Sequence, residues 1–305
     1  MVKALVFLGA HNGERFLQQQ LQSIFQQTVQ AEIVVSDDGS TDQTTSIVER
    51  FQSEKHPISL VAGPCRGFAL NFLSAFERKD LAQFDLLAWS DQDDIWHSDH
   101  LEVAQNQLKQ FSGPAVACCR TRWIDENGTF VRLSPRRGKH IHFENSLSQS
   151  ISGGNTFVFN RPAIMWLSEV LSTVSLPQGL SHDWLIYQLF CGAGLDVVFS
   201  PTPTVDYRQH STNLQGENRS VSARLKRISM ILKGSFRDQV DAHLKVLSDL
   251  NSVLIPEHRE TLKNLIQARR QPLFFRMLQL PSLGLQRERS LETFLLKLLF
   301  VFGLY

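Results

Sequence analysis

Apolar residues in the first ninety positions follow two alternating spacings. Four short apolar runs read as strands, at residues 4–8, 31–35, 58–61 and 86–89. Apolar residues then recur at helical spacing after each of the first three runs, from Glu14, around residues 47–51 and over residues 68–76. Short apolar strands that are each followed by an amphipathic helix predict an α/β fold, with a mostly parallel central sheet flanked by helices on both faces.

The chain beyond residue 110 predicts further strands. Asn127-Gly128 is typical of a tight turn, so we expect a hairpin between residues 116–124 and 130–133. Two apolar segments at residues 195–199 and 204–206 predict another pair of strands.

Polar motifs follow the predicted strands where each of them ends. HNGE follows the first strand, SDDGSTD the second, GPCRGF the third and DQDD the fourth. Ligands of mostly parallel sheets bind beyond the carboxyl ends of the strands. The motifs are therefore predicted to form one ligand site.

The DQDD motif places three carboxylates, Asp91, Asp93 and Asp94, within four residues. Carboxylates this close repel one another unless a cation or hydrogen bonds compensate. Mg²⁺ and Mn²⁺ favour one or two carboxylates together with substrate phosphate oxygens, so the motif indicates a divalent cation. The alternative is an Asp-rich turn in which Asp94 and Ser98 cap the next helix, but capping needs only one carboxylate.

The SDDGSTD motif combines a helix start with two adjacent acids. Ser40 to Asp42 suit the beginning of a helix, and Gly39 permits a tight turn. Asp37 and Asp38 can accept hydrogen bonds from a base or a ribose. GxGxxG and Walker lysine motifs, which indicate other nucleotide folds, are not in the sequence.

Taken in order, the motifs resemble those of the family 2 glycosyltransferases of the GT-A fold, and especially a rhamnosyltransferase-like branch. The resemblance covers residues 2–216 and includes GFALNF, SGGNTFVFNR, SHDW and YRQHSTN besides the motifs above. One departure concerns base recognition, because Ala10-His11 stands where the family usually has Thr-Tyr.

The resemblance implies roles for individual residues. It implies donor contacts by Ala10, His11, Glu14, Asp37, Asp38, Gly67, Asn71, Asp91 and Arg208. It implies a metal site made by Asp93 and His210, where neutral imidazole is a competent ligand for Mn²⁺. Arg208 could also neutralise a phosphate bidentately.

Asp183 opens an apolar helical run that reaches residue 190, so a helix cap is one interpretation. A sugar hydroxyl is a poor nucleophile, and inversion in one displacement needs a general base. The resemblance implies that Asp183 is this base.

The acceptor is the least constrained ligand. By resemblance it contacts Gly153, Gly154, Asn155, His182 and Trp184. A Gly-Gly pair at a strand entry can also be a bulge, and a tryptophan beside a strand end is often core packing rather than a sugar platform.

Charge divides the chain after Asn218. Up to that residue 16 Lys and Arg face 23 Asp and Glu, whereas 15 face 7 from Arg219 onward. We expect a GT-A catalytic domain at 1–218 and a basic helical C-terminal extension at 219–305. The extension is either a solvated subdomain or contacts an anionic membrane surface or a lipid-phosphate acceptor. Nucleic acid fits less well, because the aromatic residues lie within apolar runs.

Composition indicates a folded, cytoplasmic protein. Among 305 residues, 42% are hydrophobic and 20% are charged, which excludes disorder as the main state. Four cysteines without CxxC spacing favour neither disulfides nor zinc. We find no secretion signal and no uncharged apolar run of about 18 residues. The chain is expected in the cytoplasm, with peripheral contact at the inner membrane as an alternative.

The predicted function is inverting, metal-dependent transfer of a sugar, with dTDP-L-rhamnose as the donor that the resemblance implies. The acceptor is a glycan or lipid-linked glycan of a bacterial surface polysaccharide such as O-antigen. Alternatives are another hexose from a UDP- or GDP-sugar, and a catalytically silent nucleotide-sugar binding protein. A sugar-1-phosphate nucleotidyltransferase would need a Gly-rich basic loop after the first strand, which HNGE does not supply.

Overall fold

The computed structural model describes residues 2–210 and 234–305. These residues form two compact units, and the chain contributes three segments to each. The first unit consists of Met1–Arg136, Ser152–Ser172 and Asp196–Ser211. The second consists of Arg137–Ile151, Thr173–Leu195 and Thr212–Tyr305. The domain boundary expected after Asn218 lies outside the described residues.

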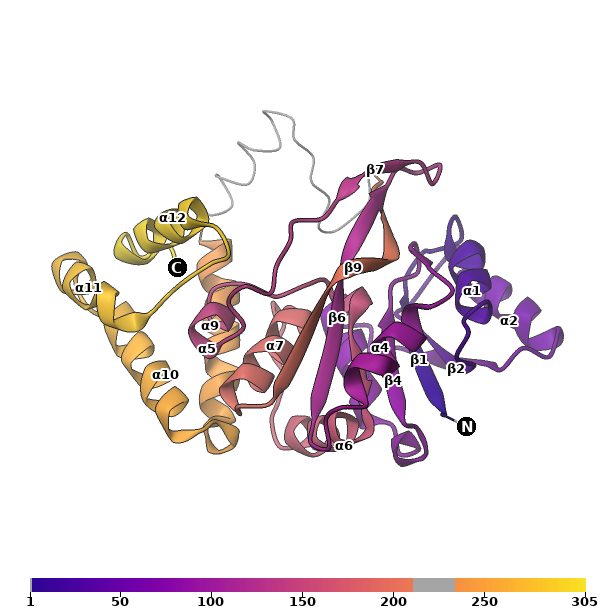
Figure 1. Ribbon diagram of the computed structural model, residues 1–305, viewed down its shortest axis with the longest axis horizontal. Coiled ribbons are helices and arrows are strands. Elements are labelled where there is room, and N and C mark those ends of the chain that lie inside the picture. Colours follow the sequence, from indigo (N-terminus) through magenta and orange to yellow (C-terminus); the bar gives the residue numbers. More distant parts are fainter. Residues whose placement is uncertain (1, 211–233) are drawn as a thin grey trace. The chain divides into compact units, whose positions relative to one another are not determined.

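All strands of the described residues belong to one nine-stranded sheet in the first unit, in the order β3-β2-β1-β4-β8-β6-β9-β5, with β7 paired to β6. Four strands near the N-terminus are parallel: β1 (Ala4–Ala10), β2 (Ala31–Asp37), β3 (Ile58–Ala62) and β4 (Leu86–Ser90). They match the four predicted strands. The expectation of a mostly parallel arrangement is confirmed for this half of the sheet (Figure 1).

The other half of the sheet mixes directions. β8 (Val158–Asn160) runs antiparallel to both β4 and β6 (Ala115–Ile124), while β9 (Asp196–Arg208) runs parallel to β6. β5 (Ile95–Trp96) is antiparallel to β9, and the predicted hairpin of β6 with β7 (Phe130–Leu133) is confirmed. Strands of two or three residues, such as β5 and β8, are too short to show a period in the sequence.

The expected pair of strands at residues 195–199 and 204–206 is wrong, because β9 is a single strand. Its register against β6 shifts between Cys119 and Thr121, opposite the part of β9 that contains Pro201 and Pro203. Prolines lack the N–H that a regular ladder needs, so they interrupt the pairing but not the extended backbone.

Helices of the first unit follow the predicted pattern with shifted ends. They are α1 (Leu17–Phe25), α2 (Thr44–Ser53), α3 (Phe68–Leu73), α4 (His100–Leu108) and α6 (Arg161–Ser172). α1 begins after Glu14 because Gly13 and Phe16 form a turn, in which the Phe16 N–H donates to the Gly13 carbonyl at 3.1 Å. The predicted third helix is α3 followed by a 3₁₀ turn, Ser74–Glu77. Shorter 3₁₀ turns are Leu81–Gln83 and Gly154–Thr156.

Buried aromatic rings join the strands to the helices of the first unit. Trp89 is completely buried and lies 4.9 Å from the Phe159 ring and 5.7 Å from those of Phe72 and Phe76, measured between ring centroids. Aromatic pairs at these separations add to the stabilisation from burial. Trp89 is therefore a core residue and does not offer a surface on which a sugar ring could stack.

The second unit is helical. It contains α5 (Phe143–Ser146), α7 (His182–Gly192), α9 (Ser235–Asp249), α10 (Pro256–Arg269), α11 (Leu273–Gln279) and α12 (Ser290–Val301), with 3₁₀ turns at Asn251–Val253 and Leu280–Leu283. Every residue of α7 is buried, so this helix is the centre of the unit. In the part of the chain that the structure describes, no helix combines the length and apolarity needed to cross a bilayer.

Candidate functional site

Loops at the ends of β1 and β2 are joined by hydrogen bonds. The Asn12 N–H donates to Ser40 Oγ at 2.9 Å, and Asn12 Oδ1 accepts from the Thr41 N–H at 2.8 Å. Glu14 Oε2 likewise accepts from the Gln43 N–H at 3.0 Å. Asn12 has a φ of 50°, a backbone region that asparagine tolerates better than most residues. HNGE and SDDGSTD therefore form one rigid platform.

The loop after β4 is attached to the same platform through Gln92. Gln92 Oε1 accepts from the His11 N–H at 2.9 Å, and its Nε2 donates to the His11 carbonyl at 3.0 Å. A Cβ on Gly13 would overlap the Gln92 side-chain amide, so a larger residue there would push Gln92 away from His11. Sequence reasoning missed both Gln92 and Gly13. The glycine of HNGE was a sequence signal of a close contact, but Gln92, which it contacts, lies some eighty positions later in the chain.

Asp38 holds the loop that follows β3. Its Oδ1 accepts from the Cys65 N–H at 2.6 Å, and its Oδ2 accepts from the Gly67 N–H at 3.1 Å. Gly67 has a φ of 94° and is the N-cap residue of α3. The Asp38 N–H donates to the carbonyl of Ala10 at 2.8 Å. Three of the predicted donor residues are thus brought together.

Two other residues that are predicted to contact the donor sugar nucleotide form hydrogen bonds with protein atoms. Asp37 accepts from the Ser40 N–H at 3.1 Å, which closes the SDDGS turn. Asn71 is buried, and its amide both accepts from Ser36 Oγ at 2.5 Å and donates to the Ser36 carbonyl at 3.0 Å. These bonds fasten α3 to β2. A direct contact of Asn71 with a donor stays a prediction.

Asp93 and His210 meet although 117 residues separate them. His210 Nε2 lies 2.6 Å from Asp93 Oδ2, and both side chains are largely enclosed. The Phe16 ring lies 5.1 Å from the imidazole and limits its orientation. A carboxylate and an imidazole side by side are suitable ligands for Mn²⁺ when phosphate oxygens complete the set. No group of three or more potential ligands occurs among the described residues.

Asp94 differs from its neighbours because it is completely buried. Its carboxylate accepts from the Asn155 side-chain amide and, at 3.2 Å, from the Arg208 N–H. Burial raises the pKa of Asp94 well above its usual range, and the carboxylates of Asp93 and Asp91 raise it further. Asp94 thus fastens the DQDD loop inside the unit. The helix-capping alternative does not hold, because the N-cap of α4 is Asp99.

Arg208 is also buried, and its guanidinium donates to protein acceptors. Nε donates to the Asp93 carbonyl at 3.0 Å, Nη1 to the Glu126 carbonyl at 2.9 Å and Nη2 to Gln19 Oε1 at 2.7 Å. The Phe16 ring lies 4.7 Å from the guanidinium carbon. These contacts make Arg208 a support of the Asp93 loop, and its predicted phosphate contact stays a prediction.

A hydrogen bond from Asn155 to Asp94 joins the Gly153-Gly154-Asn155 segment to the DQDD loop. Gly154 and Asn155 form part of the 3₁₀ turn before β8, and both are buried. A Cβ on Gly153 would lie 2.6 Å from Asn155 Oδ1, which explains the glycine at that position. The structure therefore brings the predicted acceptor loop to the predicted metal loop.

His182, Asp183 and Trp184 belong to the second unit, where they form the first turn of α7. Asp183 Oδ1 accepts from the Ser181 hydroxyl and, at 2.8 Å, from the Trp184 N–H. Ser181 is the N-cap residue, so Asp183 is not the cap that one interpretation assigned to it. Burial lowers the pKa of His182 to about 4, against the raising effect of Asp183, so His182 is neutral near pH 7.

His243 on α9 supports this turn, and sequence reasoning missed it. Its Nε2 accepts from the Ser181 N–H at 3.0 Å, and its Nδ1 lies 2.8 Å from Gln188 Oε1. Only a neutral imidazole that carries its proton on Nδ1 makes both bonds. The Trp184 ring lies 4.4 Å from His243 and donates through Nε1 to the Ser146 carbonyl at 2.5 Å. A lone histidine in an amphipathic helix carries no sequence signal for this role.

The amino-acid sequence of this chain is similar to those of known proteins. Residues 6–167 match the sequence model of glycosyl transferase family 2. A curated relative, the dTDP-rhamnosyl transferase RfbG of Shigella flexneri, is 26% identical over 253 residues, which cover 79% of this chain and 85% of that protein. The rhamnosyltransferase-like resemblance is thereby confirmed.

Solved structures share the fold at low sequence identity. S. aureus TarS 1-349, in complex with UDP-GlcNAc, superposes with a TM-score of 0.54 at 16% identity and covers 99% of this chain and 92% of its own. The mannosyltransferase PcManGT from Pyrobaculum calidifontis, in complex with GDP-Man and Mn²⁺, has a TM-score of 0.50 at 17% identity, covering 99% and 85%. The chain therefore belongs to glycosyl transferase family 2 and is a glycosyltransferase of the GT-A fold.

Proposed function

We propose that this glycosyltransferase transfers a sugar, with inversion, from a nucleoside diphosphate to a hydroxyl of a glycan or lipid-linked glycan. The observation that carries the proposal is the platform of strand-end loops that ends in the Asp93–His210 pair, within a chain of family 2. The platform supplies carboxylate oxygens and backbone groups for a nucleotide, and the pair lies at the end of the same sheet.

The proposed donor is dTDP-L-rhamnose. Support comes from the similarity to the dTDP-rhamnosyl transferase RfbG of Shigella flexneri. The donor contacts proposed for this chain are those of Ala10, His11, Glu14, Asp37, Asp38, Gly67, Asn71, Asp91 and Arg208. A hexose from a UDP- or GDP-sugar is the second candidate, because TarS and PcManGT were solved with UDP-GlcNAc and GDP-Man.

Asp93 and His210 would hold a divalent cation, Mg²⁺ or Mn²⁺, together with donor phosphate oxygens. When bound, the cation neutralises charge that develops on the leaving diphosphate. The PcManGT structure contains Mn²⁺, which supports the same requirement here. Arg208 supports the backbone of Asp93, and the Phe16 ring contacts the imidazole of His210.

Asp183 is the proposed general base. The Ser181 hydroxyl and the Trp184 N–H orient one carboxylate oxygen, which leaves the other oxygen to take the proton from the acceptor hydroxyl. The N-terminus of α7 favours the negative charge that this step requires. The acceptor is proposed to contact Gly153, Gly154, Asn155, His182 and Trp184.

The proposed setting is synthesis of a bacterial surface polysaccharide such as O-antigen, at the cytoplasmic face of the inner membrane. In this proposal residues 1–218 catalyse transfer, and the basic extension at 219–305 provides the membrane contact.

Release of nucleoside diphosphate in the presence of Mn²⁺ tests the proposal. Across a panel of nucleotide sugars, one donor should support release that increases when a glycan acceptor is added. Asp183→Asn should lower turnover about 10²- to 10⁴-fold with little change in donor binding. Asp196→Asn, at the exposed start of β9, is the matched control and should be as active as the parent. No turnover with any donor, or full turnover in Asp183→Asn, would overturn the mechanism.

A further inference from the structure

The second unit exposes an unusual number of large apolar side chains. Ten of them, each between 39% and 69% exposed, occur within the described residues after 272. They are Leu273, Phe274, Phe275, Met277, Leu278, Leu291, Phe294, Leu295, Leu298 and Phe302, and we name them the apolar face. Soluble monomers rarely expose apolar side chains in such density without a binding role.

Spacing shows that the apolar face is continuous on α12. Leu291, Phe294, Leu295 and Leu298 recur at intervals of three or four residues, as the residues on one side of a helix do. Leu296 and Phe300, on another side, are buried in the unit. α12 therefore has two apolar sides, of which one packs inward and the other meets solvent.

α11 continues the same surface. Arg276 Nη1 on α11 lies 3.5 Å from the Val301 carbonyl at the end of α12, so the two helices are neighbours within the unit (Figure 1). Five of the ten exposed apolar residues lie on α11. With seven and twelve residues, α11 and α12 are both too short to span a bilayer, but they can lie in its plane.

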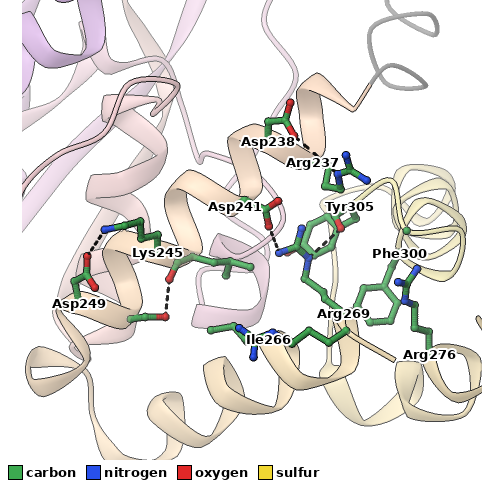
Figure 2. Close-up of a pocket in the computed structure, with 14 residues that line it drawn as sticks. Arg237, Asp238, Asp241, Lys245, Asp249, Ile266, Arg269, Arg276, Phe300 and Tyr305 are labelled. Carbon is green, nitrogen blue, oxygen red and sulfur yellow. Dashed lines mark hydrogen bonds and ion pairs between the residues drawn. The ribbon is translucent and has the colours of Figure 1, made fainter. Parts of the chain in front are cut away.

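Positive charge predominates in the part of the chain that contains the apolar face. From Arg269 to the last residue, six Lys and Arg accompany two Glu. α11 and α12 also help to line a cavity of about 660 Å³, and Figure 2 shows arginines and a lysine around it. Three of its cations are paired, Arg237 with Asp238, Arg269 with Asp241 and Lys245 with Asp249. Arg270 and Arg276, also in the lining, are in none of the ion pairs found among the described residues.

We propose that α11 and α12 dock in the plane of an anionic lipid bilayer. The apolar face enters the boundary between headgroups and acyl chains, and the exposed Arg270 meets lipid phosphates. This inference deepens the membrane contact in the proposed function, and it does not depend on the donor or on the mechanism of transfer. A second copy of the chain fits this face less well, because it would bring a second positive surface against the first.

Vesicle sedimentation of the full chain tests this docking without donor or acceptor. Binding to vesicles of phosphatidylcholine with 30% phosphatidylglycerol, roughly the charge of a bacterial inner leaflet, should exceed binding to pure phosphatidylcholine and fall with added salt. The triple variant Phe274→Ser/Leu278→Ser/Phe294→Ser should reduce the partition coefficient at least tenfold. Phe130→Ser/Val131→Ser, which removes equally exposed apolar residues from β7, should bind as the parent does.

The variant Arg270→Gln separates charge from apolar burial. It should weaken binding to the anionic vesicles about fivefold, at unchanged thermal unfolding, and leave binding to neutral vesicles unaltered. Undiminished vesicle binding by the triple variant would overturn the proposal. A dimer of the parent that forms without vesicles, seen by mass photometry, and that the triple variant does not form would also overturn the proposal. Neither result depends on diphosphate release, so failure here is distinct from failure of the catalytic proposal.

Discussion

The two units place polar and apolar groups in opposite ways. In the first unit, polar side chains gather at the strand ends and satisfy one another, while Trp89 and its aromatic neighbours are enclosed. In the second, the buried helix α7 contains His182 and Asp183, while apolar side chains of α11 and α12 face outward. The polar loops therefore indicate what the first unit binds, and the exposed apolar side chains indicate what the second unit binds.

Charge strengthens this contrast. Acidic residues outnumber basic ones before residue 219, and the reverse holds after it. Carboxylates suit the part of the chain that is proposed to hold a cation, whereas arginines suit a surface that meets lipid phosphates. Neither charge pattern would serve the other task. Variants in each unit can therefore test the comparison separately.

Asp93→Asn should have the largest effect. Asparagine keeps the size of the side chain but removes the charge beside His210, so turnover should fall on the order of 10³-fold. The measurement is diphosphate release over a range of Mn²⁺ concentrations. Asp99→Asn is the control in the same loop region, because Asp99 is exposed and its side chain makes no cap bond. Equal losses in both variants would contradict a specific role for Asp93.

Trp89→Ala should be the most destabilising of the packing changes. It leaves a cavity among Phe72, Phe76 and Phe159, and the free energy of unfolding should fall by about 3–5 kcal/mol. Phe294→Ser on the apolar face should change it by no more than about 0.5 kcal/mol. Urea unfolding followed by circular dichroism compares the two. A large loss in Phe294→Ser would mean that this side chain supports the fold and is not available for docking.

Acid should destabilise the second unit through His243. Burial lowers its pKa to about 3, below the ordinary value of about 6.5. Between these values the unfolded chain binds a proton that the folded chain does not, so stability is lost as the pH falls below about 6.5. At pH 5 this loss is about 2 kcal/mol for one such histidine.

Urea unfolding at pH 7 and pH 5 measures this loss. His243→Gln should lose less stability over that interval than the parent does, because glutamine does not titrate. The comparison uses the difference between the two pH values, so any change at pH 7 from the altered Ser181 bond cancels. Identical pH dependence in parent and variant would show that His243 does not cause the loss.

Much of the first unit could be predicted, because its signals are local. An apolar run followed by a helical period identifies a strand and a helix, and a motif after the run identifies a strand end. This reasoning located β1 to β4 and the loops with Asp38 and Asp93. It failed for β9, where prolines interrupt the apolar pattern although the backbone stays extended.

Residues that hold the site together by bonding to other protein atoms were harder to recognise from the sequence. Arg208 and Asn71 have the side chains of ligand-binding residues, but their groups bond to protein atoms. Gln92 lies in the DQDD motif between the acids that drew attention, and His243 lies in no motif, yet each orients a segment that contains a predicted site residue. A sequence shows the type of a side chain and not its partner.

By itself, the sequence determined the first four strands and the helices between them, the polar chemistry at the strand ends, and membership of the family. These features depend on residues close together along the chain. Only the tertiary structure decided that Asp93 meets His210, that Asp94 bonds to Asn155, and that α12 leaves one apolar side exposed. Each depends on which distant segments pack together, because burial and pairing are properties of neighbours in space.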